Sequence, residues 1–69
     1  MGFAESIKDL RLRAFLTQEE FAKVLGVSFA TVNRWETGKA KPTIKTMKLI
    51  DLYCKDNQFT FDINEAIKE

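Results

Sequence analysis

The stretch TQEEFAKVLGVSFATVNRW, residues 17–35, contains the signals that decide how this chain folds. Thr17 followed three residues later by Glu20 forms a capping box, which predicts a helix start near residue 18. Gly26 is the residue type best suited to leave a helix through a left-handed conformation, and Ser28, two residues later, is a good N-cap for the next helix. Two helices joined this tightly cannot lie antiparallel.

Apolar side chains mark the sides of these two helices that face a core. In the second helix, which is predicted to end before Gly38 and Pro42, only Val32 and Trp35 have the character and spacing of a buried face. Ala22 is small where the two helices pass closest. The apolar stripe of the first helix and the wedge between the helices include Phe21, Val24, Leu25 and Val27. The pattern is that of a helix-turn-helix.

Three further helices are predicted outside this stretch. Apolar residues at helical spacing indicate a helix over about residues 3–14, and Thr43 can cap another that runs to about residue 56. The latter has apolar residues on two sides, so we expect it to be covered on two faces. A second capping box predicts a short helix over about residues 62–69. The prediction is an all-α bundle of five helices. The one possible strand is a weakly indicated extended segment at residues 59–61.

Length and composition exclude several classes of function. Sixty-nine residues make one domain, residues 1–69, and no stretch approaches the roughly 18 apolar residues of a membrane span. The N-terminus lacks a secretory signal, so we expect a cytoplasmic protein. With one cysteine, Cys54, and no histidine, the chain cannot form an intrachain disulfide and is poorly suited to zinc binding or Cys-His catalysis. We expect no enzyme activity, metal, cofactor or small-molecule site.

Charge is unevenly distributed along a chain whose net charge is only +1. Residues 1–33 are balanced, and residues 49–69 are acidic. The segment between them, residues 34–48, has a single acidic residue, Glu36. Its basic residues are Arg34, Lys39, Lys41, Lys45 and Lys48. Such a segment is typical of a phosphate-binding face, and the alternative is a solvated lysine-rich surface.

The helix that begins at Ser28 has an outer side with no place in the core. If Val32 and Trp35 hold this helix inward, its other residues project away, N-terminal end first. These outward residues are Ser28, Phe29, Ala30, Asn33 and Arg34. A helix presented in this way fits the major groove of B-DNA.

The longer stretch LTQEEFAKVLGVSFATVNRWETGKAKP, residues 16–42, resembles the helix-turn-helix of the XRE family, which includes the lambdoid phage repressors and Cro proteins. With the flanking helices, the resemblance covers about residues 3–56. The residues at the family's spacing are Gln18, Ala22, Gly26, Val27, Val32, Trp35, Glu36, Gly38, Lys39 and Pro42. The resemblance implies a lambda-repressor-like bundle and a transcriptional regulator that reads double-stranded DNA with helix 28–36, with repression favoured over activation.

The resemblance implies roles for the residues at the start of each helix. Gln18 matches a position whose amide holds a phosphate and supports the reading helix, although it could be a plain exposed residue. Phe29 and Ala30 match the first base-facing positions, where apolar side chains would contact a thymine methyl group. Phe29 departs from the family's polar residues, so we expect Gln18 to lose its amide partner. Phe29 could instead pack on a partner subunit or on the first helix.

Further roles are implied toward the end of the reading helix. Arg34 can bond guanine O6 and N7 together, with phosphate contact as the alternative. Asn33 can pair with adenine or lie at the edge of the groove. Arg11 and Glu36 match a structural ion pair of the family. The positions expected to contact the DNA backbone are Thr31, Thr37, Lys39 and Lys41.

A protein-interaction module, or an antitoxin-type domain that binds a partner, is the alternative function. Its support is an apolar C-terminal segment with Phe59, Phe61, Ile63 and Ile67. These residues either close the core or form a two-fold interface, which would place two reading helices about one DNA turn apart. We favour a homodimer on an inverted-repeat operator, associated with the nucleoid.

Overall fold

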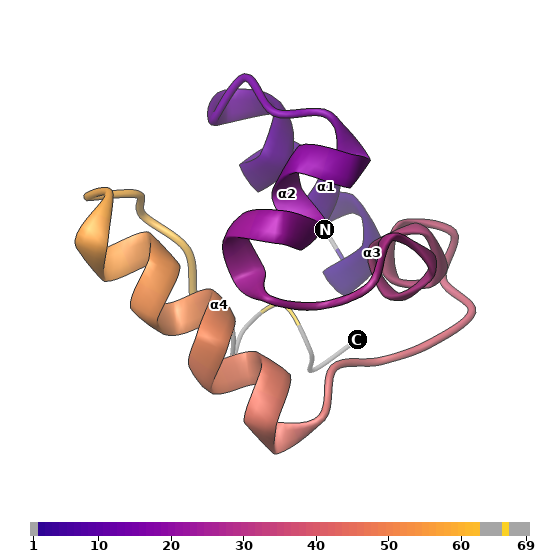
Figure 1. The fold of residues 1–69 in the computed structure, drawn as a ribbon. Coiled ribbons are helices and arrows are strands. Elements are labelled where there is room, and N and C mark those ends of the chain that lie inside the picture. The colour runs from indigo at the N-terminus through magenta and orange to yellow at the C-terminus, as the bar shows by residue number, and fades with distance from the viewer. Residues whose placement is uncertain (1, 63–65, 67–69) are drawn as a thin grey trace.

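The computed structural model describes residues 2–62 and residue 66. The described part contains no strand, and its helices are α1 (Phe3–Arg13), α2 (Gln18–Leu25), α3 (Phe29–Glu36) and α4 (Ile44–Asp56), as Figure 1 shows. The all-α prediction is confirmed, with helix starts and ends within one residue of those expected. The predicted extended segment at residues 59–61 is not a strand. The predicted fifth helix, about 62–69, falls mainly on residues outside the described part.

Side-chain caps begin three of the four helices. Thr17 and Glu20 form the predicted capping box, in which each side chain bonds the backbone N–H of the other. The pKa of Glu20 is lowered, first because the Thr17 backbone N–H donates to its carboxylate. Ser28 and Thr43 cap α3 and α4 by accepting from backbone N–H groups at 3.1 and 3.2 Å. Together these caps fix where the chain enters each helix.

The turn between α2 and α3 depends on one glycine. Gly26 has a φ of 76°, a left-handed conformation that a residue with a Cβ adopts only at a cost in strain. The N–H of Val27 donates to the carbonyl of Ala22 at 3.0 Å and closes the end of α2. α3 therefore leaves the turn across α2 instead of running back along it, as the tight spacing predicted.

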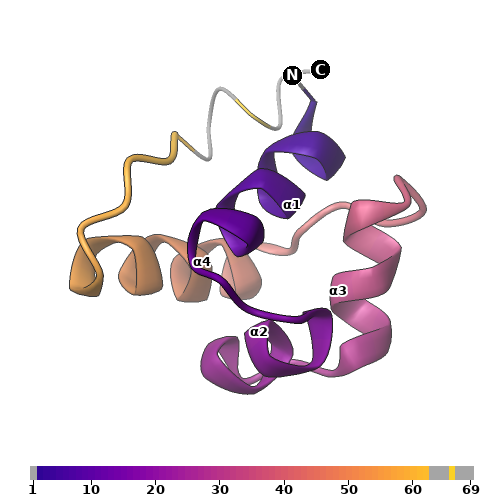
Figure 2. The same ribbon diagram turned by 90° about the horizontal axis from the view of Figure 1, so that it is seen from above.

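The core lies where α1, α2 and α3 meet, and α4 covers it from the α2 side (Figure 2). Phe3 of α1 meets Trp35 of α3 edge to face, with ring centroids 5.8 Å apart. Phe21 of α2 makes a similar contact with Tyr53 of α4 at 5.9 Å. The fully buried large side chains are Ile7, Leu10, Phe21, Val32, Trp35 and Ile50. α3 packs mainly on α1 and α2, and residues 28–30 and 34 on its far side are exposed.

Two expectations about burial are wrong. Val24 is 51% exposed, since only Phe21, Ala22 and Leu25 of α2 reach the core. The expectation for the second apolar side of α4 fails at one residue: Leu52 is 57% exposed, whereas Tyr53 packs against Phe21 and Phe59. Leu52 lies on the side of α4 opposite the buried Ile50, which accounts for its exposure.

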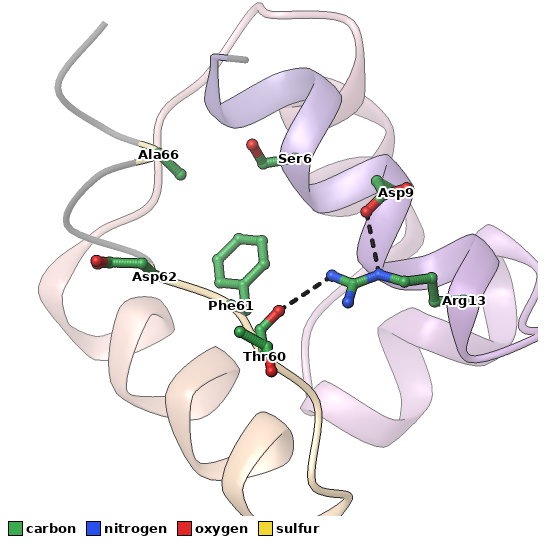
Figure 3. Close-up of a pocket in the computed structure, with 7 residues that line it drawn as sticks. All are labelled: Ser6, Asp9, Arg13, Thr60, Phe61, Asp62 and Ala66. Carbon is green, nitrogen blue, oxygen red and sulfur yellow. Dashed lines mark hydrogen bonds and ion pairs between the residues drawn. The ribbon is translucent and has the colours of Figure 1, made fainter.

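The segment after α4 returns to α1 and helps to close the core. Phe59 stacks on Tyr53 at 6.0 Å, and Phe59 and Phe61 are half-buried against the core. Arg13 holds this segment by donating to the carbonyl of Thr60 at 3.2 Å (Figure 3). Between α1 and this segment lies a cavity of about 270 Å³. Phe59 and Phe61 therefore help to close the core, as one of the two interpretations predicted, whereas Ile63 and Ile67 lie outside the described residues.

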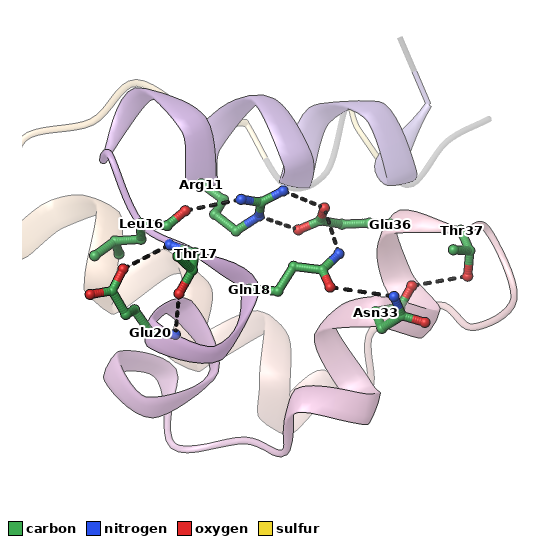
Figure 4. Close-up of polar contacts among 8 residues, drawn as sticks. All are labelled: Arg11, Leu16, Thr17, Gln18, Glu20, Asn33, Glu36 and Thr37. Carbon is green, nitrogen blue, oxygen red and sulfur yellow. Dashed lines mark hydrogen bonds and ion pairs between the residues drawn. The ribbon is translucent and has the colours of Figure 1, made fainter.

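A polar cluster joins α1, α2 and α3 at the edge of the core (Figure 4). Arg11 donates to both carboxylate oxygens of Glu36, at 2.8 Å from Nε and 3.0 Å from Nη2. Its third donor, Nη1, reaches the carbonyl of Leu16 at 2.9 Å and fixes the loop before α2. The pKa of Arg11 is raised, mainly by the hydrogen bond to Glu36. The two side chains are 11% and 3% exposed, so the pair is largely removed from water.

Gln18 extends this cluster to the middle of α3. Its amide nitrogen donates to Glu36 at 3.1 Å, and its oxygen accepts from the amide of Asn33 at 3.3 Å. The expectation that Gln18 loses its amide partner because Phe29 is apolar is therefore wrong. The partner lies one turn later in α3 than the position considered.

Glu36→Ala should lower the free energy of unfolding by about 3–5 kcal/mol, because it leaves the Arg11 guanidinium buried without its counter-charge. This is a large part of the stability of a small domain. Urea unfolding followed by the fluorescence of Trp35, the single tryptophan, measures the loss. The control is Asp51→Ala, which breaks an ion pair with Lys55 whose side chains are 45% and 73% exposed and should cost less than about 1 kcal/mol. Equal losses in the two variants would contradict the structural role of the pair.

Cys54 should report on the integrity of the core. The residue is 4% exposed, and burial raises the pKa of its thiol, which lowers the fraction of reactive thiolate. We expect a thiol reagent such as a disulfide dye to label the native protein far more slowly than the urea-unfolded protein. Labelling should accelerate along the same urea transition that Trp35 fluorescence reports. Rapid labelling of the native protein would show that α4 does not cover the core as described.

Candidate nucleic-acid interface

α3 presents one face to the core and another to solvent. Val32 and Trp35 on the inner face are 0% and 2% exposed. The outward residues expected from the sequence are exposed at four positions, namely Ser28, Phe29, Ala30 and Arg34. Since α2 lies behind α3 and the polar cluster clamps the end of the helix, this outer face is held on a rigid support.

The N-terminal end of the outer face is apolar. Phe29 is 52% exposed and Ala30 beside it is exposed, while the Ser28 hydroxyl is occupied in capping the helix. Phe29 does not fold back into the core, so its ring remains on the surface. An exposed apolar side chain at the start of such a helix can contact another apolar group, but it offers no hydrogen bond.

Three of the predicted contact residues are less available to a ligand than expected, because each already makes a hydrogen bond within the protein. They are Asn33, Thr31 and Thr37. Asn33 is half-buried on the α2 side of α3 and donates to Gln18. The Thr31 hydroxyl shares a hydrogen bond with that of Ser28 at 2.8 Å. The Thr37 hydroxyl lies 2.9 Å from the carbonyl of Asn33 and donates to it, so its hydrogen is used within the end of α3. Each of these three side chains can still accept a hydrogen bond from a ligand through its oxygen, and Asn33 also keeps one N–H group.

The loop after α3 folds back onto the end of that helix. The carbonyl of Arg34 accepts from the N–H groups of Lys39 and Ala40 at 2.9 and 3.2 Å. Gly38 supports this turn with a φ of 75°. Lys39 and Lys41 are exposed on the loop, and Arg34 is exposed on the helix beside it. The backbone thus brings the first cations of the basic segment next to the outer face of α3.

The solvent-exposed charge of residues 34–48 is more positive than their sequence alone indicates. Glu36 is the one acidic residue among residues 34–48, and its carboxylate is buried against Arg11. The basic residues of the same segment are all exposed, namely Arg34, Lys39, Lys41, Lys45 and Lys48. All the solvent-exposed charge of this segment is therefore positive.

The contact between Gln18 and Asn33 is the feature of this interface that sequence reasoning missed. The two residues are 15 positions apart and lie on different helices, so no local spacing pairs them. The available signal was Gln18 itself, whose amide at the start of α2 needed a partner on α3.

The described part of the chain has neither a metal-binding cluster nor a membrane-spanning helix. Among residues 2–62 and residue 66, no group of three or more acidic residues or cysteines lies close enough together to hold a metal ion. No helix in that part is long and apolar enough to cross a membrane.

Comparison with known proteins places this geometry in a family. A family model described as helix-turn-helix matches residues 7–55. The transcriptional activator BcrR of Enterococcus faecalis is 38% identical over 67 residues, which are 97% of this chain and 30% of that protein. The uncharacterised transcriptional regulator YiaG of Escherichia coli K12 is 44% identical over 46 residues, 67% of this chain and 48% of that one.

The relatives also include a protein of another class. The type II methyltransferase M.SsoII of Shigella sonnei is 44% identical over 52 residues, which are 71% of this chain but only 14% of the methyltransferase. No solved structure gives a significant match. The chain spans about half or less of the length of these relatives. Because the family match covers the four described helices from the middle of α1 nearly to the end of α4, the chain belongs to the XRE-type helix-turn-helix family.

Proposed function

We propose that this protein binds double-stranded DNA in a sequence-specific way and regulates transcription. The observation that carries the proposal is the outer face of α3, exposed over an inner face that is fully buried. An α-helix held in this way enters the major groove with its N-terminal residues toward the bases. Membership of the helix-turn-helix family supports the same role.

The proposed contacts divide into base reading and phosphate binding. Phe29 and Ala30 meet thymine methyl groups, and Arg34 bonds guanine through its planar fork. The proposed phosphate-binding residues are Gln18, Ser28, Thr31, Thr37, Lys39 and Lys41. Phosphate contacts set affinity and its dependence on salt, whereas base contacts set specificity.

We further propose that the protein acts as a homodimer on an inverted repeat and represses transcription. Two copies related by a two-fold axis would place their α3 helices about one DNA turn apart. Occupancy of a promoter is sufficient for repression, because it blocks access without requiring a further contact. The relative BcrR is named as an activator, which is the opposite of the repression proposed here. A promoter–reporter assay distinguishes repression from activation. The proposed place of action is the nucleoid, in the cytoplasm.

A protein-binding function is the second candidate, and Phe15 is the observation that favours it. This side chain is 93% exposed, and its backbone has a φ of 59°, which is unusual for a residue with a Cβ. Leu12, at the end of α1, is 54% exposed. If the chain is a protein-interaction module or an antitoxin-type domain, its partner protein would cover these side chains, and DNA binding would be weak and independent of sequence.

Selection from a random duplex library separates the two functions. The enriched duplex and a scrambled duplex are titrated by fluorescence anisotropy at two salt concentrations. An inverted-repeat site bound at least ~10³-fold more tightly than the scramble, with a steep salt dependence, supports the DNA-binding function. Weak binding of both duplexes would contradict it and support a protein partner.

Arg34→Ala should weaken binding to the selected site by about 1–3 kcal/mol and relax the base preference at one position in each half-site. Lys39→Ala should weaken binding to selected and scrambled duplexes alike and reduce the slope of log K against log salt by about 1. Anisotropy titrations of both variants on both duplexes measure these effects. If Arg34→Ala reduces affinity equally on both duplexes, Arg34 binds phosphate and does not read a base.

Phe29→Ser should remove the preference for thymine at the position that Phe29 faces, because a hydroxyl makes no favourable contact with the methyl group. The comparison is between the selected duplex and one with uracil in place of that thymine. Loss of the methyl group should weaken binding of the unaltered protein and have no effect on Phe29→Ser. Val24→Ser, which alters an exposed apolar residue of α2, is the control and should keep the sensitivity to uracil. Equal sensitivity in Phe29→Ser and the unaltered protein would exclude this contact.

A further inference from the structure

A chain of hydrogen bonds links α1, α2 and α3, and its donors lead from both ends toward Glu36 of α3 (Figure 4). Glu36 accepts from Arg11 at 2.8 and 3.0 Å and from the Gln18 amide at 3.1 Å. The oxygen of Gln18 accepts from the amide of Asn33 at 3.3 Å. A carboxylate only accepts hydrogen bonds, whereas a carboxamide has one donating and one accepting end. The charge on Glu36 therefore decides how both amides are turned.

In this chain, the orientation of each group determines the orientation of the amide that bonds to it. Gln18 has to present its NH₂ group to the Glu36 carboxylate, so its carbonyl oxygen faces α3. The Asn33 side chain must therefore donate to that oxygen from its own NH₂ group. Reversing either amide would place two acceptors against each other in a part-buried site, where water cannot easily compensate. The ion pair with Arg11 holds the Glu36 carboxylate in place and so maintains this order.

The part of the Asn33 amide that remains free has one acceptor and one donor. One N–H is used by Gln18, so the carbonyl oxygen and the second N–H are left. In Figure 4 the amide nitrogen of Asn33 points toward Gln18. Adenine is the base whose major-groove edge has an acceptor, N7, beside a donor, N6. Guanine offers two acceptors there, cytosine a donor, and thymine an acceptor and a methyl group.

We infer that the chain from Arg11 to Asn33 presets the Asn33 amide to read adenine, with Gln18 as a positioning residue. The inference rests on the proposed DNA-binding function and adds to it the base that one side chain selects. The amide is oriented before DNA arrives, so binding does not have to immobilise it. A freely rotating asparagine would bond other bases through either end, and the fixed one matches adenine alone.

The test compares base preferences in four proteins: the unaltered chain, Asn33→Ala, Gln18→Met and Asn57→Ala. Asn57→Ala is the matched control, because it removes an amide that bonds Tyr53 at the end of α4. A duplex is first selected with the unaltered protein, and each position is then replaced by the three other base pairs. Thermal unfolding of every variant checks that it folds. Because Gln18 is also proposed to bind phosphate, the readout is the preference at each position, not overall affinity.

The unaltered protein and Asn57→Ala should prefer adenine at one position of each half-site by about 5- to 150-fold. Asn33→Ala should abolish that preference and leave the others unchanged. Gln18→Met should reduce it at the same position although Asn33 is still present. Full adenine preference in Gln18→Met would overturn the positioning role. A selected site whose preferences are unaffected by Asn33→Ala would overturn the inference and leave the proposed function intact. Failure of the unaltered protein to select any site would overturn both.

Discussion

The part-buried ion pair between Arg11 and Glu36 is the contact on which the position of α3 depends. It ties the last turn of α1 to the last residue of α3, and the Nη1 group of Arg11 fixes the loop that leads into α2. Val32 and Trp35 hold α3 through apolar contacts, which set its distance from the core but are not directional. The ion pair adds direction, because a guanidinium and a carboxylate meet in one plane. Together they leave α3 little freedom to rotate about its axis.

The apolar residue at the start of α3 and the polar contact in its middle belong together. Phe29 cannot serve as a hydrogen-bond partner for Gln18, and Asn33, one turn further along, takes that part. The outer face is thereby divided into an apolar end, a polar middle and a cationic end at Arg34. A surface divided in this way can distinguish ligands by the order of their chemical groups, in addition to their charge.

Local signals made much of the fold predictable. The caps at Thr17, Ser28 and Thr43 act over three residues, and the turn at Gly26 depends on the conformation of one residue. Because both features are local, the sequence alone predicts them. Burial was harder to predict, because Leu52 is apolar and yet more than half exposed. The contact between Gln18 and Asn33 depends on how two helices cross, which residue spacing does not encode. The outward face of α3 was predictable because it is the complement of a two-residue apolar face.

The burial of Glu36 has an electrical consequence for the whole molecule. The net charge is only +1, so a distant polyanion attracts the protein weakly. With Glu36 hidden, however, the exposed charge of residues 34–48 is wholly positive, whereas Asp51 and Asp56 further along the chain are not buried. The protein therefore carries a local concentration of exposed positive charge that its net charge does not reveal. Because the Debye length is about 8 Å at physiological salt, an anion close to residues 34–48 responds to this local charge more than to the net charge of the molecule.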